Sequence, residues 1–192
     1  MQRAIGMVEF SSIARGIYAA DQMVKVSEVE IVTASTSCPG KYIAIVHGDV
    51  AAVKTSIETG EREAGEYYID SMVIPNVHQQ VFPALTGSTN VERIDALGIM
   101  ESFSIAAMLE TADAILKAAD LEGVELRLGN GLGGKSFFTY TGDVAAVKSG
   151  TAAGREIVQN KGLMVNFEVI PSPSPILVGF TDVILLGKGE HL

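Results

Sequence analysis

Residues 48–54 read Gly48-Asp49-Val50-Ala51-Ala52-Val53-Lys54, and the same seven letters return at residues 142–148. Shorter matches surround them: GMVE at 6–9 with GIME at 98–101, SIA at 12–14 and 104–106, and the Ile-Pro pair at 74–75 and 170–171. The offset between the copies grows along the chain, so the second copy carries small insertions. One structural unit therefore occurs twice in the sequence.

Each copy has the pattern of six elements in the order β-α-β-β-α-β. The first copy shows strands at 4–10, 29–33 and 42–46, helices at 12–26 and from residue 50, and a last strand that ends at 75. The second copy shows strands at 96–102, 124–128, 136–141 and 163–170, with helices at 104–119 and 143–159. This order predicts an α/β (α+β) protein made of two tandem ferredoxin-like domains.

Turn-forming residues set the domain boundaries. We assign residues 1–82 to the first domain, 83–95 to a linker that contains Pro, Gly and Ser, and 96–171 to the second domain. Residues 172–192 form a C-terminal tail, in which the Ser-Pro-Ser-Pro stretch excludes regular structure. Helix N-caps are expected at Ser11 or Ser12 and at Asp49.

The composition excludes several classes of protein. Of the 192 residues, 47% are hydrophobic and 19% are charged, which is incompatible with a disordered chain. The net charge of −9 leaves no basic surface for nucleic acid. A single cysteine excludes an internal disulfide, and neither a signal peptide nor a membrane helix is expected. We expect a soluble cytosolic protein whose sparsely charged surface partly faces other protein chains.

One segment resembles a phosphate-binding motif. Residues 129–136, GNGLGGKS, match the P-loop pattern GxxxxGK[ST] from Gly129 to Ser136. A P-loop needs a helix directly after it, whereas residues 137–141 have the pattern of a strand. The corresponding loop of the first copy shares only Lys41, which matches Lys135. We favour a β-hairpin loop, with a small-molecule- or nucleotide-binding regulator as the alternative.

No catalytic constellation stands out. The three histidines, His47, His78 and His191, lack the spacing of metal ligands. Glu9 and Glu101 end equivalent strands, and we interpret them as a repeated structural hydrogen-bond acceptor, with paired acid–base chemistry as the less favoured alternative. The sequence thus favours a protein that is not an enzyme.

The repeated motifs G-[IM]-x-E, S-I-A, A-D-x-x-x-K and G-D-V-A-A-V resemble those of tandem bacterial microcompartment (BMC) shell proteins, over residues 4–171. The resemblance implies a homotrimer whose six domains form a pseudohexamer. Such tiles pack edge to edge with other shell proteins in the bacterial cytoplasm, without nucleic acid or membrane. Lys25 and Lys117 match the edge lysine of the family, although a solvated helix lysine is the alternative. After Ile-Pro this chain lacks the Arg-Pro-His stretch that the family often carries.

The same resemblance implies a central pore lined by the loop between the second and third strands of each repeat. These loops are residues 36–40 and 129–134. The first loop would contribute Ser37, Pro39 and Gly40 to the pore lining. The second loop would contribute Gly131, Leu132, Gly133 and Gly134. Glycines would present backbone amides to polar metabolites without blocking the pore.

Cys38 lies in the first of these loops. A solitary cysteine is often a small buried hydrophobe, but threefold symmetry would bring three thiols to one axis. The Cys-Pro-Gly-Lys stretch is similar to that of the trimeric propanediol-utilisation shell proteins, which implies one [4Fe–4S] cluster per trimer with three Cys38 ligands. The cluster would transfer electrons across the shell or be delivered to an encapsulated or cytosolic redox enzyme. A metabolite-conducting tile with a free thiol is the alternative.

Overall fold

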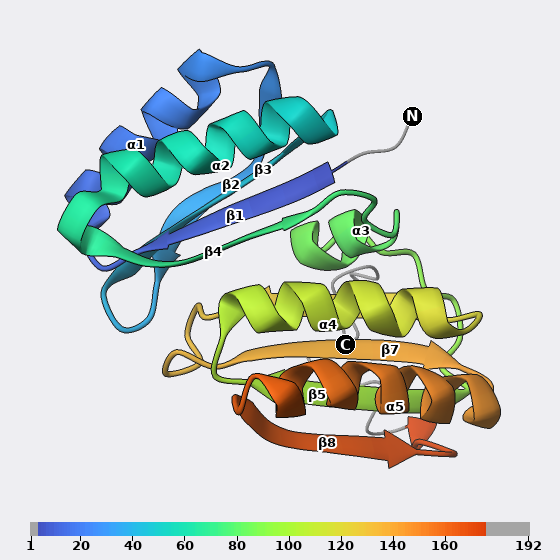
Figure 1. Cartoon of the computed structure of the whole chain (residues 1–192). Coiled ribbons are helices and arrows are strands. Elements are labelled where there is room, and N and C mark those ends of the chain that lie inside the picture. The colour runs from blue at the N-terminus through green and yellow to red at the C-terminus, as the bar shows by residue number, and fades with distance from the viewer. Residues whose placement is uncertain (1–3, 176–192) are drawn as a thin grey trace, which may run out of the picture. The chain divides into compact units, whose positions relative to one another are not determined.

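Each repeat folds into a four-stranded antiparallel sheet covered by two long helices (Figure 1). The computed structural model describes residues 4–175, so His191 and most of the expected tail lie outside the described residues. The chain divides into two compact units. Among the described residues, the first unit contains residues 4–77 together with Gly129–Gly134, and the second contains His78–Leu128 and residues 135–175.

The first sheet has the strand order β2-β3-β1-β4, which is the order of a ferredoxin-like unit. A short 3-10 turn, Gly65–Tyr67, precedes its last strand. The elements are β1 (Ala4–Phe10), α1 (Ile13–Val26), β2 (Val29–Ser37), β3 (Lys41–Gly48), α2 (Val50–Ala64) and β4 (Tyr68–Ile74).

The second sheet repeats this topology in the order β6-β7-β5-β8. Its elements are β5 (Ala96–Ser102), α4 (Ile105–Ala118), β6 (Glu122–Leu128), β7 (Ser136–Gly142), α5 (Val144–Asn160) and β8 (Met164–Ile170). Even the irregularities recur, because the register of β1 on β4 shifts after Glu9 and that of β5 on β8 shifts after Glu101. The predicted fold class and the duplication are confirmed.

The structure differs from the sequence-based expectation in two places. Strand β2 continues to Ser37, which pairs with Lys41, so Thr36 and Ser37 belong to the strand and not to the loop. A further short helix, α3 (Val81–Thr86), forms where we expected the start of a linker. Pro83 fits there because the first helical turn needs no N–H from it, and Gly87 ends the helix in the left-handed conformation at φ 67°.

The core of each unit lies between its sheet and its two long helices. Every residue of β1 is buried, and α2 packs directly on this strand. A Cβ added at Gly6 would lie 2.6 Å from Ile57 Cγ1, so glycine permits the close approach of helix and strand. In the second unit the corresponding Gly98 would place a Cβ 2.3 Å from the ring of Tyr140.

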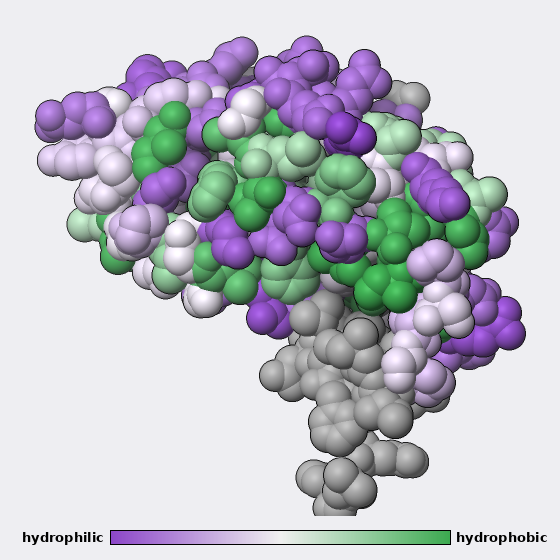
Figure 2. All heavy atoms as spheres, turned by 90° about the horizontal axis from the view of Figure 1, so that it is seen from below, coloured by the Kyte–Doolittle hydropathy of each residue, from purple (hydrophilic) through white to green (hydrophobic). Residues whose placement is uncertain are grey.

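Not all hydrophobic side chains are buried. Figure 2 shows one face on which hydrophobic and hydrophilic residues form interspersed patches. Large exposed hydrophobic residues include Ile13, Ile17 and Tyr18 on α1, Ile31 on β2, and Phe103 in the turn between β5 and α4. None of the helices in the described part of the chain is long and apolar enough to cross a bilayer.

Candidate functional site

The loop between the second and third strands differs in length between the repeats. In the first repeat only residues 38–40 lie outside the paired strands, since Ser37 and Lys41 are register partners. In the second repeat seven residues, 129–135, separate β6 from β7. The second loop therefore has the greater reach at the same topological position.

The two loops contact each other within the first unit. The backbone N–H of Cys38 donates a hydrogen bond of 3.1 Å to the carbonyl oxygen of Gly129. A Cβ built at Gly134 would lie 3.6 Å from the carbonyl oxygen of Cys38 and 3.7 Å from Pro39 Cδ. Cys38 is a free, half-buried cysteine. Its backbone is thus fixed both by its own hairpin and by the glycine-rich loop of the second repeat.

The glycines of these loops are required by the backbone conformation. Gly129, Gly131, Gly133 and Gly134 all have positive φ angles of 61–88°, and Gly40 has 76°. Strand β7 begins at Ser136, directly after the loop. The helix N-terminus on which a P-loop depends is therefore not present at this position, and the structure favours the hairpin interpretation.

A glutamate–lysine ion pair recurs at the base of each loop. Lys41 Nζ lies 2.9 Å from Glu9 Oε1, and Lys135 Nζ lies 2.9 Å from Glu101 Oε2. Both lysines directly follow a predicted pore loop, and both glutamates are near the end of the central strand beside it. The first pair is the more enclosed, because the Glu9 side chain is 5% exposed against 31% for Glu101.

This arrangement explains residues that the sequence left ambiguous. The P-loop-like lysine, Lys135, holds a carboxylate of its own chain. Glu9 and Glu101 each accept a hydrogen bond from a lysine and lie in separate repeats, which agrees with a structural acceptor. The pairing was missed because neither residue is near its partner in sequence, although all four recur at matching positions of the repeats.

Lys25 and Lys117, the predicted shell-edge lysines, lie in the last turns of α1 and α4. Each pairs with the aspartate one turn earlier, Lys25 with Asp21 at 2.5 Å and Lys117 with Asp113 at 2.7 Å. Such a pair fixes the direction of a flexible lysine. Contact across a tile edge stays a prediction for both lysines.

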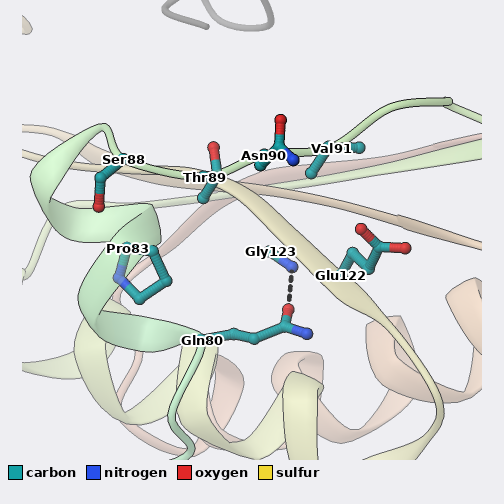
Figure 3. Close-up of a pocket in the computed structure, with 8 residues that line it drawn as sticks. All are labelled: Gln80, Pro83, Ser88, Thr89, Asn90, Val91, Glu122 and Gly123. Atoms are coloured by element: carbon teal, nitrogen blue, oxygen red, sulfur yellow. Dashed lines mark hydrogen bonds between the residues drawn. The ribbon is translucent and has the colours of Figure 1, made fainter.

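A pocket of about 250 Å³ lies in the second unit, at the end of β6 that is opposite the loop of residues 129–135. Gln80 closes one side, where its side-chain oxygen accepts a hydrogen bond of 2.7 Å from the N–H of Gly123 (Figure 3). The side chain of Glu122 lies on the other side of this bond (Figure 3). The bond anchors the start of α3 to β6.

Comparison with known proteins decides the family. A family model described as the BMC domain matches residues 4–77 and, a second time, residues 96–173. The chain belongs to the BMC-domain proteins. The bacterial microcompartment shell protein PduT of Citrobacter freundii is 40% identical over 173 residues, which cover 90% of this chain and 94% of PduT.

Solved structures agree with this assignment. A microcompartment protein from Desulfitobacterium hafniense DCB has 47% sequence identity and a TM-score of 0.89, over 92% of this chain and 98% of that one. The fused permuted hexameric shell protein MSM0275 of the RMM microcompartment shares the fold alone, with a TM-score of 0.62 and 17% identity over 82% of this chain and 84% of its own. The resemblance to tandem BMC shell proteins is confirmed, and the chain is a shell protein of a bacterial microcompartment.

Proposed function

We propose that this shell protein forms a homotrimeric tile in which Cys38 of three copies holds one [4Fe–4S] cluster at the central pore. The observation that carries the proposal is the position of the sole thiol, at the turn between β2 and β3 and beside the second pore loop. Among the described residues, no group of three or more Cys, His, Asp and Glu side chains lies together to hold a metal within one chain. A cluster with cysteine ligands therefore requires several copies.

The residues around Cys38 fit such a group. Cβ atoms built at Gly40, Gly131 and Gly133 meet nothing within 4 Å, so there is open space at the turns of both loops. The Cys38 backbone is held by its hydrogen bond to Gly129, which leaves the thiol as the group free to bind. When bound, a [4Fe–4S] cluster supplies one-electron redox chemistry, which suits electron transfer across the shell or delivery to a redox enzyme.

The experiment is anaerobic reconstitution with iron and sulfide, followed by metal analysis and electron paramagnetic resonance of the reduced protein. We expect about four iron atoms for every three chains, as a [4Fe–4S] cluster requires. Cys38→Ser should abolish iron binding and the signal while the oligomer keeps its size in light scattering. The matched control is Ser37→Ala, at the neighbouring position of β2, which should bind iron as the unmodified chain does.

Two results would reject the cluster. Iron retained by the Cys38→Ser protein would show that another group binds it. A trimer that takes up no iron would favour the second candidate, a tile that conducts metabolites past a free thiol. The observation that favours this candidate is the set of open positive-φ glycines, which leave backbone amides accessible at both loops. Thiol titration of the folded trimer would then find one reactive Cys38 in each chain.

A further inference from the structure

The start of the second unit is bound to its own helix α4 by one aspartate. Asp113 Oδ2 pairs with Lys117, and Asp113 Oδ1 accepts a hydrogen bond of 2.7 Å from the backbone N–H of His78. His78 is the fourth residue after β4. Asp113 is buried, so both of its oxygens are satisfied inside the folded chain.

The corresponding aspartate of the first repeat has a partner among the described residues for only one of its two carboxylate oxygens. Asp21 occupies the position of Asp113, and its Oδ2 likewise pairs with the lysine one turn later, Lys25. The Nε2 of Gln22 donates to the same oxygen at 2.9 Å. Asp21 Oδ1 has no hydrogen-bond partner among residues 4–175, and the residue is exposed. The acceptor that His78 fills on α4 is open on α1.

The apolar side chains on the same two helices show the same difference, because those on α1 are more exposed than those on α4. Ile17 on α1 is 54% exposed, whereas its counterpart Leu109 on α4 is fully buried. Ile13 is 38% exposed, and its counterpart Ile105 is 2% exposed. The face of α1 that carries Ile13 and Ile17 is therefore exposed, whereas the equivalent face of α4 is covered.

The chain contains a second copy of the segment that provides the covering N–H. Residues 171–175 follow β8 as residues 75–79 follow β4, and both segments begin with proline. Pro173 is buried, as is its counterpart Val77. Ser174 takes the place of His78, and it is the only residue of 173–175 with a backbone N–H, since prolines flank it. Ser174 is exposed.

We infer that Ser174 of one copy donates its backbone N–H to Asp21 Oδ1 of the next copy, with residues 171–175 lying on the exposed face of α1. From His78 onward, the segment after β4 belongs to the following unit of the chain. After β8 no further unit follows among the described residues. The N–H of Ser174 therefore finds its acceptor, Asp21 Oδ1, on the first unit of another copy. Each copy gives one segment and receives one, so the contact is head-to-tail, and in the trimer of the proposed function it closes into a ring. This inference deepens the trimer of the proposed function and rests on it.

The test removes a single hydrogen-bond donor. Ser174→Pro abolishes the N–H, and Ser174→Ala keeps it while removing only the hydroxyl. Sedimentation velocity over a range of concentrations should show an increase of about tenfold or more in the concentration at which the Ser174→Pro oligomer dissociates, because hydrogen bonds to charged groups are among the stronger ones. Ser174→Ala should associate like the unmodified chain.

A second pair of variants addresses the acceptor. Asp21→Ala should weaken association with little change in the thermal unfolding of the separated chain, because its ion pair with Lys25 is exposed. Asp113→Ala should lower the unfolding temperature of the separated chain, because its partner His78 lies in the same unit. Carrying out the series in the Cys38→Ser background separates the contact from the cluster, since association is measured without iron.

Two outcomes would overturn the contact. The first is a Ser174→Pro protein that associates as tightly as the unmodified chain, or an unmodified chain that stays monomeric. The second is a Ser174→Pro protein whose unfolding temperature falls with no change in association, which would mean that the segment covers α1 of its own chain. A failed iron reconstitution in a protein that passes these tests would reject the cluster alone.

Discussion

Glu9 and Lys41 form an ion pair at the base of the first predicted pore loop. Glu9 is almost fully buried, and Lys41 provides its hydrogen bond at 2.9 Å. An ionised carboxylate in such a place depends on its partner, since a buried charge without one is costly. The pair Glu101–Lys135 has the same geometry with a more exposed glutamate. The lysine that follows each loop thus stabilises the fold by pairing with a glutamate on the neighbouring strand.

We predict that Lys41→Ala destabilises the chain more than Lys135→Ala does. Removal of Lys41 leaves a buried carboxylate unpaired, at a cost of about 1–3 kcal/mol, whereas solvent screens Glu101, so its loss is about 1 kcal/mol or less. Urea unfolding of both variants measures the difference, and Glu9→Gln with Lys41→Ala should recover part of the loss.

Equal stability losses in the Lys41→Ala and Lys135→Ala variants would contradict the role of burial.

Titration calorimetry with Mg-ATP tests the alternative of a nucleotide-binding regulator. Binding to the unmodified chain that Lys135→Ala abolishes would support that alternative.

The buried Tyr140 makes the free energy of unfolding fall at high pH. Burial raises the pKa of Tyr140 from 10.0 to about 12, and the hydrogen bond to Thr151 acts in the opposite direction. Between these values the folded chain holds a proton that the unfolded chain has lost, so stability falls as pH rises through this window. The loss amounts to about 2–3 kcal/mol by its upper end.

Tyr140→Phe checks this assignment. Near neutral pH the variant should be less stable by about 1 kcal/mol, because the 2.6 Å hydrogen bond to Thr151 is lost. Thr151 keeps its bond to the Val147 carbonyl, which limits the cost. The deficit should shrink and then reverse as pH rises from 10 to 12, as measured by denaturant unfolding at each pH. A constant deficit across this range would contradict the raised pKa.

Helices α2 and α5, which begin within the same seven-residue stretch, differ at their first turn. Asp143 accepts a hydrogen bond of 2.7 Å from the N–H of Ala146, whereas the side chain of Asp49 makes no capping bond on α2. We predict that Asp143→Ala costs about 1 kcal/mol of unfolding free energy. Asp49→Ala should cost less, since only its charge near the helix N-terminus is lost. Thermal unfolding of the two variants compares them directly, and equal losses would contradict the difference in capping.

Much of this fold was predictable at the level of elements. A run of apolar and β-branched residues predicted β1, and the repeat predicted β5, both with the bounds that the structure has. Helix α3 was missed because its six residues are too few to show a period, and Pro83 and Gly87 there suggested a loop. Strand β2 runs longer than predicted, since pairing with β3 overrides the turn propensity of Thr36 and Ser37.

The candidate site was only partly predictable. The position of Cys38 in a pore loop came from the family resemblance, and the structure adds the hydrogen bond to Gly129 that fixes it. That contact joins residues far apart in the chain and belongs to no repeat or motif, so sequence periodicity has no means to show it. The same holds for the open oxygen of Asp21, which becomes visible only beside its filled counterpart on α4.

At the scale of the whole molecule, the two repeats share a fold and differ in what remains exposed. The chain has few charges for its length, and part of its apolar surface lies on α1 rather than in a core. Duplication within one chain lets one copy of a surface be covered internally while the other stays available to a neighbour. The proposed ring uses this surface, because in it the free face of each chain joins the next chain.

We predict that Ile17→Asp blocks assembly without unfolding the chain. Ile17 is more than half exposed, so an aspartate there costs the separated chain little, but burying the charge under a neighbour costs about 2 kcal/mol or more, roughly a thirtyfold weakening. Light scattering at several concentrations measures the assembly, and circular dichroism follows unfolding.

Lys54→Asp, on the exposed side of α2, is the control for added negative charge and should assemble normally. Leu109→Asp, at the equivalent buried position of α4, should instead fail to fold, because the same charge enters a covered site. An Ile17→Asp protein that assembles at the same concentration as the unmodified chain would show that α1 faces solvent in the tile, and the asymmetry between the repeats would then have no part in holding the ring together.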